Sequence, residues 1–413
     1  MKVHERRTKQ VVTLTGEVRL TRPYYYHAKC HGHAIPVDEQ LGLGASSLSL
    51  GLQEALCLTS AHLPFEAAVE LVERLSGVAV SPTTAQQVAE TVGAEIAQLQ
   101  QAECEAAWAG QLPSGPAQVP ERLYVSMDGI NTPMQDGWHE LKVGTCYEVK
   151  RQPPSAEYPE GQLRAVNASY IATQAEAKDF GKPMWVEAAK RGVEKTDQGV
   201  ILGDGASWIW NIAYSQFGAY QPIEIVDWYH ASQHVWAAGN ALYGEGNDET
   251  KNWVKGRLDE LWADQLDTML AAFDAAAQFR PTARNALAEQ RAYFETNRQR
   301  MRYAHFRAAG YQIGSGPVES ACKRVVALRL KQAGMRWSAA GAKAMVHLRA
   351  LVLSQRWDAF WRQRRPPLRH YRTPCWGMPA RCGGPCRVRI SWWWYVIRET
   401  ATRAYSPRLK RGR

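Results

Sequence analysis

The chain has 413 residues, enough for two or three domains, and its 45% hydrophobic and 22% charged residues are typical of soluble globular proteins. It has no apolar run of about 18 residues, which argues against a transmembrane helix. The net charge of +10 is unevenly distributed, because residues 362–413 carry +13 and the rest of the chain −3. Net charge is therefore a weak argument for a nucleic-acid partner.

The eight cysteines are scattered along the chain rather than grouped as in a disulfide framework. The first ten residues, MKVHERRTKQ, are charged and lack the apolar core of a secretory leader. These features predict reduced thiols and a cytoplasmic protein without a membrane partner.

Residues 1–45 are predicted to form a small β region. VVTLTGEVRLTRPYYY alternates apolar and polar residues around a turn at residues 15–16. The region is locally basic, with seven Lys and Arg against two Glu in residues 1–36. His27 and Cys30 have the spacing of half a zinc knuckle. The other half is missing, so the segment is interpreted as a degenerate knuckle and zinc is not expected.

Residues 46–110 have a helical pattern, with helix starts at Pro64 and Pro82 and a stop at Gly77. A helix, a short turn and a second helix resemble a helix-turn-helix DNA-binding motif. The residues of the second helix that would read DNA are Thr83, Thr84, Gln86 and Gln87. A plain helical bundle is the alternative, because this set contains no Arg or Lys. Residues 111–120, rich in Pro and Gly, are predicted to form a linker.

Residues 121–361 are predicted to form an α/β domain. RLYVSMDG, HELKVGTCYEVK and AVNASYIAT indicate three successive strands, and helices then alternate with the strands GVILGDGA and PIEIVDW. From about residue 231 to 310 the pattern is wholly helical, which predicts an all-helical insertion. Residues 362–413 form a basic, irregular tail whose lack of periodicity suggests translation past the natural end of the domain.

Three carboxylates occupy positions that suit metal-dependent chemistry. Asp128 and Asp204 each follow an apolar strand and stand beside glycine, so we expect both to project from strand ends. Glu319 lies near the start of a helix that Pro317 would favour. Each carboxylate alone is explained by a turn or a helix-terminal charge. Three in this order suit a site in which hard oxygen ligands hold two Mg²⁺ ions ~3.5–4 Å apart.

The stretch VDWYHASQHV, residues 226–235, raises the question of a metal-binding pair or a pH switch. His230 and His234 are four residues apart and would share one face of a helix. No further set of ligands is evident, so zinc is not expected and His234 is interpreted as structural.

These motifs resemble one family. VSMDG, ILGDGASWIWN, VDWYHASQH and IGSGPVESACKRVVALRLKQAGMRW together are similar to DDE-type insertion-sequence transposases of the ISKra type, which are related to the Mutator-like and hAT-like group. The resemblance covers about residues 10–361. It implies an α/β ribonuclease H-like catalytic domain with an all-helical insertion, preceded by a small β/helical DNA-binding region.

The resemblance also implies roles for individual residues. Asp128, Asp204 and Glu319 would bind two Mg²⁺ or Mn²⁺ ions, and Asp227 and His230 would form an accessory signature pair. The protein would be bacterial and nucleoid-associated, and it would act as a homodimer or higher oligomer because two DNA ends must be paired. Two departures count against zinc-dependent DNA binding and recognition of DNA ends: His27 replaces the first Cys of an expected C-x-x-C pair, and the basic tail is unusual.

Basic residues follow Glu319, on or just after its helix. Phosphate contacts from these residues would position a transposon end near the metals, and Trp337 would stack on a flipped base at the cleavage site. A solvated helix face and a core tryptophan are the alternatives. The residues expected to contact DNA are Lys323, Arg324, Arg329, Lys331, Arg336 and Trp337.

The expected function is Mg²⁺-dependent DNA cleavage and strand transfer at the ends of an insertion sequence. One alternative is a structure-selective nuclease on the same fold, which would make no joined products. Another is a DNA-binding remnant of a mobile element without catalytic activity, and the three retained carboxylates argue against it.

Overall fold

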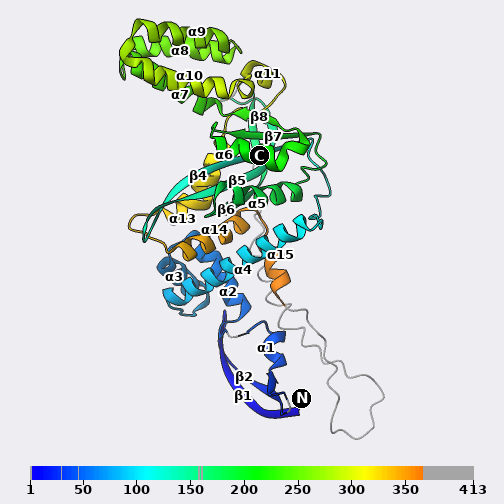
Figure 1. Ribbon diagram of the computed structural model, residues 1–413. Helices are drawn as coiled ribbons and strands as arrows, with labels where there is room; N and C mark the ends of the chain where they lie inside the picture. The colour runs from blue at the N-terminus through cyan, green and yellow to red at the C-terminus, as the bar shows by residue number, and fades with distance from the viewer. Residues whose placement is uncertain (1, 29, 45, 157–158, 160, 366–413) are drawn as a thin grey trace, which may run out of the picture. The chain divides into compact units, whose positions relative to one another are not determined.

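The computed structural model describes residues 2–28, 30–44, 46–156, 159 and 161–365 (Figure 1). The chain divides into two units, and the first, Met1–Arg365, contains all of the described residues. All the elements below belong to the first unit. The predicted basic tail lies outside the described residues except for positions 362–365.

The N-terminal segment is a long antiparallel ribbon. β1 (Lys2–Thr13) pairs with β2 (Gly16–His27), and β2 pairs with the short β3 (Gly32–Ala34). The turn between β1 and β2 requires Gly16, whose φ is +111°. The helix α1 (Pro36–Gln40) follows. The predicted β region is therefore present, and its strands are longer than the sequence pattern suggested.

Three helices follow the ribbon: α2 (Leu50–His62), α3 (Phe65–Ser76) and α4 (Pro82–Trp108). The predicted starts and stop are confirmed, since Pro64 is the N-cap of α3, Ser81 caps α4 through Thr84 N–H, and Gly77 ends α3 with φ +73°. α4 packs closely on a later helix, α14 (Ala339–Leu353). Gly93 permits this approach, because a Cβ there would lie 2.2 Å from the carbonyl oxygen of Ala344.

A five-stranded mixed sheet with the order β6-β5-β4-β7-β8 lies at the centre of the chain. β4 (Arg122–Met134), β5 (Gly137–Gln152) and β6 (Gln162–Thr173) form an antiparallel meander. β7 (Gln198–Gly203) runs parallel to β4, and β8 (Ile223–Val226) runs parallel to β7. The five predicted strands are thus present, and the three parallel strands direct their carboxyl ends to the same edge.

Helices cover both faces of this sheet. On one face, Val125 and Met127 of β4 share a core with Phe180 of α5 (Ala177–Lys190) and Ile209 of α6 (Ser207–Ile212). Two short turns follow α6, the π-helix η1 (Ala213–Phe217) and the 3₁₀-helix η2 (Gly218–Tyr220). On the other face, Val143 of β5 shares a core with residues of α4, α14 and the segment after residue 316. The result is a three-layer α/β arrangement.

The helical insertion is present and drawn apart from the sheet in Figure 1. It begins at Trp228, three residues earlier than expected, and its last helix ends at Ala308. Val235 and Phe294 of the insertion belong to the same core cluster as the α5 face of the sheet. Its elements are α7 (Trp228–Tyr243), α8 (Asp248–Trp262), α9 (Leu266–Phe279), η3 (Pro281–Ala283), α10 (Arg284–Thr296), η4 (Arg298–Arg300) and α11 (Tyr303–Ala308).

The C-terminal helices include an irregular turn. α12 (Gly316–Ala321) continues into a π-helix, η5 (Cys322–Ala327), and then into α13 (Leu328–Leu330). A π-turn has i→i+5 hydrogen bonds and frequently occurs at functional sites. The sequence predicted one regular helix here, and hydrophobic periodicity does not resolve a single inserted residue. α15 (Trp357–Arg364) ends the described chain.

No helix of the described chain combines the length and the apolar character that a membrane span requires. Cys30, which is exposed, and the buried Cys57, Cys104, Cys146 and Cys322 are free thiols.

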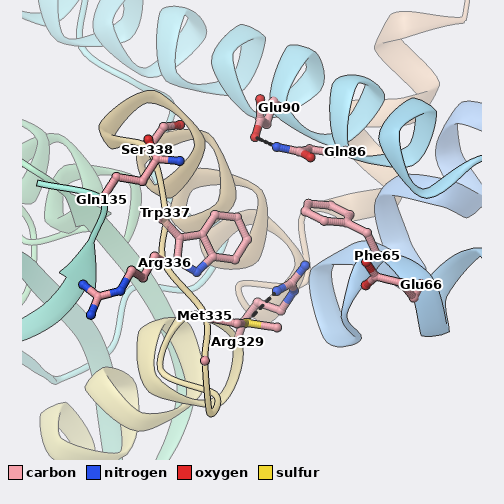
Figure 2. A pocket seen from close by; sticks show the side chains of 11 residues that line it. Phe65, Glu66, Gln86, Glu90, Gln135, Arg329, Met335, Arg336, Trp337 and Ser338 are labelled. Carbon is pink, nitrogen blue, oxygen red and sulfur yellow. Dashed lines mark hydrogen bonds between the residues drawn. The ribbon is translucent and has the colours of Figure 1, made fainter.

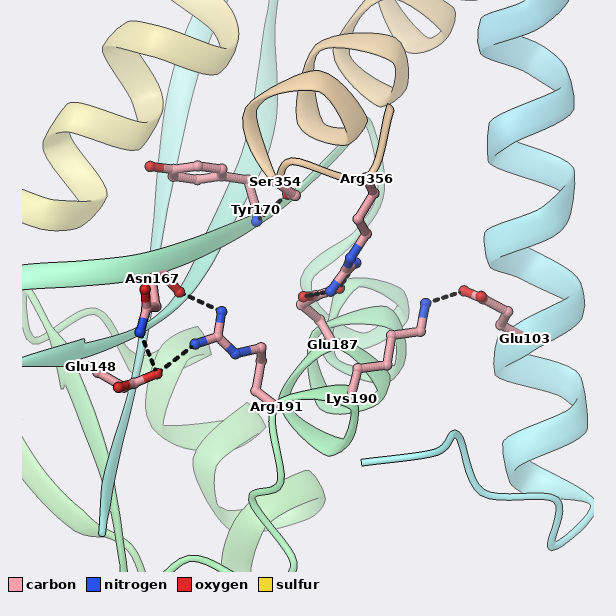
Figure 3. Close-up of polar contacts among 9 residues, drawn as sticks. All are labelled: Glu103, Glu148, Asn167, Tyr170, Glu187, Lys190, Arg191, Ser354 and Arg356. Atoms are coloured by element: carbon pink, nitrogen blue, oxygen red, sulfur yellow. Dashed lines mark hydrogen bonds and ion pairs between the residues drawn. The ribbon is translucent and has the colours of Figure 1, made fainter. Parts of the chain in front are cut away.

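Ion pairs tie α5 to its surroundings (Figure 3). Arg356 donates to both carboxylate oxygens of Glu187 at 2.6 and 2.5 Å, and the Glu187 side chain is only 1% exposed. Ser354 Oγ accepts from Tyr170 N–H of β6 at 2.9 Å. These contacts fix the segment after α14 against both α5 and the outer strand of the sheet.

We expect Arg356→Ala to lower the free energy of unfolding by about 3 kcal/mol, because it leaves the buried Glu187 carboxylate without its cation. Arg74→Ala is the control, since Arg74 and Glu70 form an exposed pair with side chains 75% and 62% exposed, and we expect a loss below about 1 kcal/mol. Urea denaturation of the two variants would measure both values. Equal losses would contradict the assigned importance of the Glu187 pair.

Candidate active site

Three aspartates form a row at the edge where the parallel pairing of β4, β7 and β8 ends. β4 and β7 pair up to Ser126 and Leu202, and β7 and β8 pair up to Gly203 and Val226. Continuing this register places Asp128, Asp204 and Asp227 next to one another on adjacent strands. The carboxyl ends of parallel strands are the usual site of ligand binding in α/β proteins.

Asp128 differs in one respect from the prediction. It does not follow the end of its strand, because β4 continues through Asp128 to Met134 and pairs Asp128 with Val143 of β5. Only the parallel pairing with β7 stops before it, at Ser126. The expectation of a strand end at Asp128 was therefore wrong, because the short apolar run LYVSM marks the buried part of a longer hairpin strand.

The Asp128 carboxylate lies among other candidate site residues. Its Oδ1 accepts from Gly129 N–H at 2.6 Å, and the Cys322 thiol donates to Oδ2 at 3.6 Å. Burial raises the pKa of Asp128 and the charge of Asp204 raises it further, while Gly129 N–H, the Cys322 thiol and His230 lower it in part. Asp204 and His230 thus lie close enough to Asp128 to affect its charge.

Asp204 is held by the turn that follows β7 and by the helical insertion. Its Oδ1 accepts from Ala206 N–H at 2.8 Å, and its carbonyl oxygen accepts from the hydroxyl of Tyr293 of α10 at 2.7 Å. Gly205 is required here, since its φ is +102° and a Cβ would lie 2.6 Å from the Tyr293 ring. Burial and the charge of Asp204 raise the pKa of Tyr293, which keeps its hydroxyl protonated as a donor.

Glu319 approaches the same region from α12. This short helix packs on β4 and β5, and Ser315 Oγ donates to Glu319 Oε1 at 3.1 Å. Cys322, three residues after Glu319, contacts Asp128, and the charge of Glu319 contributes to the raised pKa of the Cys322 thiol after burial and Asp128. Among the residues with assigned positions, no group of three or more His, Cys, Asp and Glu side chains is arranged to hold a metal ion.

The structure therefore brings the two aspartates together, while Glu319 lies on α12, which packs on β4, the strand of Asp128, and on β5. Carboxylate oxygens are the ligands that Mg²⁺ and Mn²⁺ prefer, and a cation would stabilise the two neighbouring carboxylates, where the charge of Asp204 contributes to the raised pKa of Asp128. The residues present at this edge fit a divalent cation by their chemistry. Asp128, Asp204 and Glu319 remain the predicted ligands.

Asp227 connects three segments of the chain through hydrogen bonds. It is fully buried, its Oδ2 accepts from His230 N–H at 2.9 Å, and its Oδ1 accepts from Ser315 N–H at 2.8 Å. Its own N–H donates to Gly203 O at 2.7 Å. One carboxylate thus caps α7 and fixes the loop that precedes α12, so Asp227 links β7, the insertion and the helix of Glu319.

His230 and His234, the two histidines of VDWYHASQHV, lie on α7. His230 is partly exposed, and its ring centroid is 6.2 Å from that of His234. His234 stacks on Tyr293 with centroids 3.6 Å apart, and its Nδ1 lies 2.6 Å from Gln290 Oε1. Burial lowers the pKa of His234. These packed contacts agree with the structural interpretation of His234.

Two of the six residues expected to contact DNA are buried, so the expectation was wrong for them. Arg329 is fully buried, donates to Ser60 O at 2.8 Å and lies 4.8 Å from the Phe65 ring and 4.9 Å from the Trp337 ring. Trp337 is 6% exposed and packs edge-on against Phe65. The guanidinium caps the carboxyl end of α2, so neither side chain is available to DNA in this conformation. Burial lowers the pKa of Arg329 to about 10, which leaves it charged at neutral pH.

The other four expected contacts, Lys323, Arg324, Lys331 and Arg336, have exposed side chains. Arg324 Nη1 donates to the Tyr170 hydroxyl at 3.3 Å. Their exposure is compatible with phosphate contact, which stays a prediction.

A cavity of about 320 Å³ lies between α3, α4 and the loop before α14 (Figure 2). It is lined by Phe65, Glu66, Gln86, Glu90, Gln135, Arg329, Gly334, Met335, Arg336, Trp337 and Ser338. Gln135 follows Asp128 by seven residues at the far end of the β4–β5 hairpin, roughly 20 Å along the strand. The cavity is therefore separate from the carboxylate row, and Trp337 does not lie at the predicted cleavage site.

The sequence did not identify three residues that contact the candidate site residues: Ser315 and Cys322, which contact carboxylates, and Tyr293, which contacts the carbonyl oxygen of Asp204. Ser315 and Cys322 lie within the motif IGSGPVESACKR, where their spacing of four and three residues from Glu319 could have indicated a shared helix face. Tyr293 lies 89 residues after Asp204, and no local pattern connects the two.

We expect Asp227→Asn to lower the free energy of unfolding by about 1–3 kcal/mol, because the amide nitrogen would face a backbone N–H that the carboxylate now satisfies. Asp136→Asn is the control, since Asp136 is 69% exposed and pairs only with His139 in the described chain. Denaturant unfolding would measure both. An Asp227→Asn protein as stable as the control would show that the buried link is dispensable.

No curated protein matches the chain. The model of the Uncharacterised protein family (UPF0236) matches residues 1–358, so the chain belongs to this family.

Proposed function

We propose that this protein is a DNA transposase that cleaves the ends of an insertion sequence and joins them to target DNA. The observation that carries the proposal is the juxtaposition of Asp128 and Asp204 just beyond the parallel pairing of β4 with β7, with the helix of Glu319 packed on β4. The finer assignment to DDE-type transposases of the ISKra type, with a ribonuclease H-like fold, rests on the motif resemblance. The five-stranded mixed sheet with helices on both faces supports it.

Divalent cations bound by Asp128, Asp204 and Glu319 would supply activation of the attacking oxygen and charge stabilisation at the leaving oxygen. The protein's own residues would position these ligands. Gly129 and Ala206 N–H orient the two aspartates, and Ser315 orients Glu319. Asp227 would fix the loop of Glu319 relative to β7, which makes it a positioning residue.

DNA is the proposed partner, as transposon end and as target. The exposed Lys323, Arg324, Lys331 and Arg336 follow Glu319 and would contact phosphates of the bound DNA. Lys331 and Arg336 lie beside Trp138 and Gln135 at the far end of the β4–β5 hairpin, so their contacts would fall away from the carboxylate row. Pairing of two ends requires two active sites, so we propose a homodimer or higher oligomer.

We expect Asp204→Ala to reduce Mg²⁺-dependent cleavage of duplex DNA carrying the element's ends by about a thousandfold, because metal-ion stabilisation of a transition state amounts to several kcal/mol. DNA binding should persist. Asp248→Ala is the matched control, since Asp248 is 88% exposed on the insertion and should leave cleavage unchanged.

Gel analysis of cleaved and joined DNA would check both variants. Wild-type cleavage by Asp204→Ala would refute the site. Cleavage by the unaltered chain without joined products, when a 3′-hydroxyl donor is supplied, would instead indicate a nuclease. No cutting by the unaltered chain would favour a DNA-binding remnant.

We expect His230→Ala to reduce strand transfer by about tenfold to a hundredfold without removing metal binding, because His230 lies near Asp128 but is not one of the predicted ligands. Calorimetric titration with Mn²⁺ would test metal binding, and joined products would report activity. Strand transfer at the wild-type rate would reduce His230 to a structural marker of the fold.

A further inference from the structure

The β1–β2 ribbon has two faces with different environments. On one face Val11 is 2% exposed, the buried Arg22 pairs with Asp38 of α1, and Lys9 Nζ donates to Gly44 O at 3.1 Å. Backbone hydrogen bonds between Val12 and residues 47 and 49 anchor the turn end of the ribbon. This face is packed against the following segment of the chain.

The opposite face is exposed and polar. Successive strand residues alternate between faces, and residues paired across the two strands share one. Thr8 pairs with Thr21 and Gln10 with Arg19, and Arg6 precedes them on the same side. All five side chains are exposed. We call Arg6, Thr8, Gln10, Arg19 and Thr21 the ribbon face.

The ribbon face carries a net positive charge. It contains two arginines and three uncharged hydrogen-bonding residues. Glu5 lies on the other side, where it pairs with Arg7 at 2.5 Å, while the exposed Glu17 lies on the same side as the ribbon face, opposite Val12 and next to the turn. Two arginines against this one carboxylate at the turn end leave this side positive, which favours a polyanionic partner.

The dimensions of the ribbon face suit duplex DNA. The major groove is about 12 Å wide and accepts a two-stranded β-ribbon. Four residues of strand separate Arg6 from the Gln10–Arg19 pair, roughly 13 Å. The two arginines can therefore stand near opposite sides of a groove, with the paired threonines between them.

We propose that the ribbon face lies in the major groove of DNA, with Arg6 and Arg19 on phosphates and Thr8, Thr21 and Gln10 toward base edges. The identity of the partner rests on the proposed function. The inference deepens that function by assigning DNA docking to an element remote in sequence from the carboxylates. An isolated two-stranded ribbon is marginally stable, and DNA would support the face that the protein leaves uncovered.

The test compares adjacent arginines on opposite faces. Arg7 is exposed like Arg6, but it stacks on Tyr24 with its guanidinium carbon 3.6 Å from the ring centroid. Arg6→Ala and Arg7→Ala remove the same charge at neighbouring positions, so unspecific electrostatics would affect both equally. Both are made in the full chain carrying Asp204→Ala, without Mg²⁺, so that binding is measured apart from cleavage.

Fluorescence anisotropy with a labelled mixed-sequence DNA duplex, over a range of salt concentrations, gives the affinities. We expect Arg6→Ala to bind about tenfold more weakly and to lower the salt slope by about one, as for the loss of a phosphate contact, while Arg7→Ala stays within about twofold. Arg19→Ala should repeat the effect of Arg6→Ala. Circular dichroism would establish that all the variants are folded.

Three outcomes would overturn the inference: equal losses for Arg6→Ala and Arg7→Ala, no loss for either, or no duplex binding by the chain. Failure of the proposed function is distinguishable. A chain that never cleaves DNA, or whose Asp204→Ala variant cleaves normally, would refute the catalytic assignment and leave the binding comparison intact.

Discussion

The buried carboxylate of Asp227 connects the parts of the molecule that must meet at the carboxylate row. Its two oxygens accept from the first turn of α7 and from the loop before α12, and its backbone donates to the end of β7. A buried carboxylate is costly unless its lone pairs are satisfied, so this arrangement tolerates little displacement of any partner. The positions of Asp204, the insertion and Glu319 are thereby mutually dependent.

Much of this organisation could be predicted from the sequence. Strand alternation and helix start residues located the ribbon, α2 to α4, the five-stranded sheet and the insertion, because these patterns depend on local periodicity. The order Asp128, Asp204, Glu319 indicated a candidate site, since the two aspartates follow short apolar runs of sequence. What the sequence could not predict were contacts at long separation, such as Tyr293 with Asp204, and the double acceptor role of Asp227.

The clearest error of the sequence analysis was the expectation that Arg329 contacts DNA, and the burial of this arginine explains it. The sequence alone does not distinguish Arg329 and Arg349 from arginines on the surface. Both are buried, and they donate to the carbonyls of Ser60 and Ala61, respectively, near the end of α2. Arg349 also donates to the carbonyls of Arg324 and Val325 in η5. Carbonyl oxygens at a helix end attract cations, and this environment outweighs the usual exposure of arginine. The N-terminal helices are thus joined to the turn that follows Glu319.

The π-turn η5 makes the length of this segment matter differently from that of the regular helix before it. A π-turn contains one more residue than an α-turn, so deleting one residue from Cys322–Ala327 would allow regular α winding with the flanking turns kept in register. Deleting one residue from the regular turn of α12 would instead rotate the part before it by about 100°. Glu319 would then turn away from β4. A one-residue deletion should therefore be tolerated better within η5 than in the turn that carries Glu319.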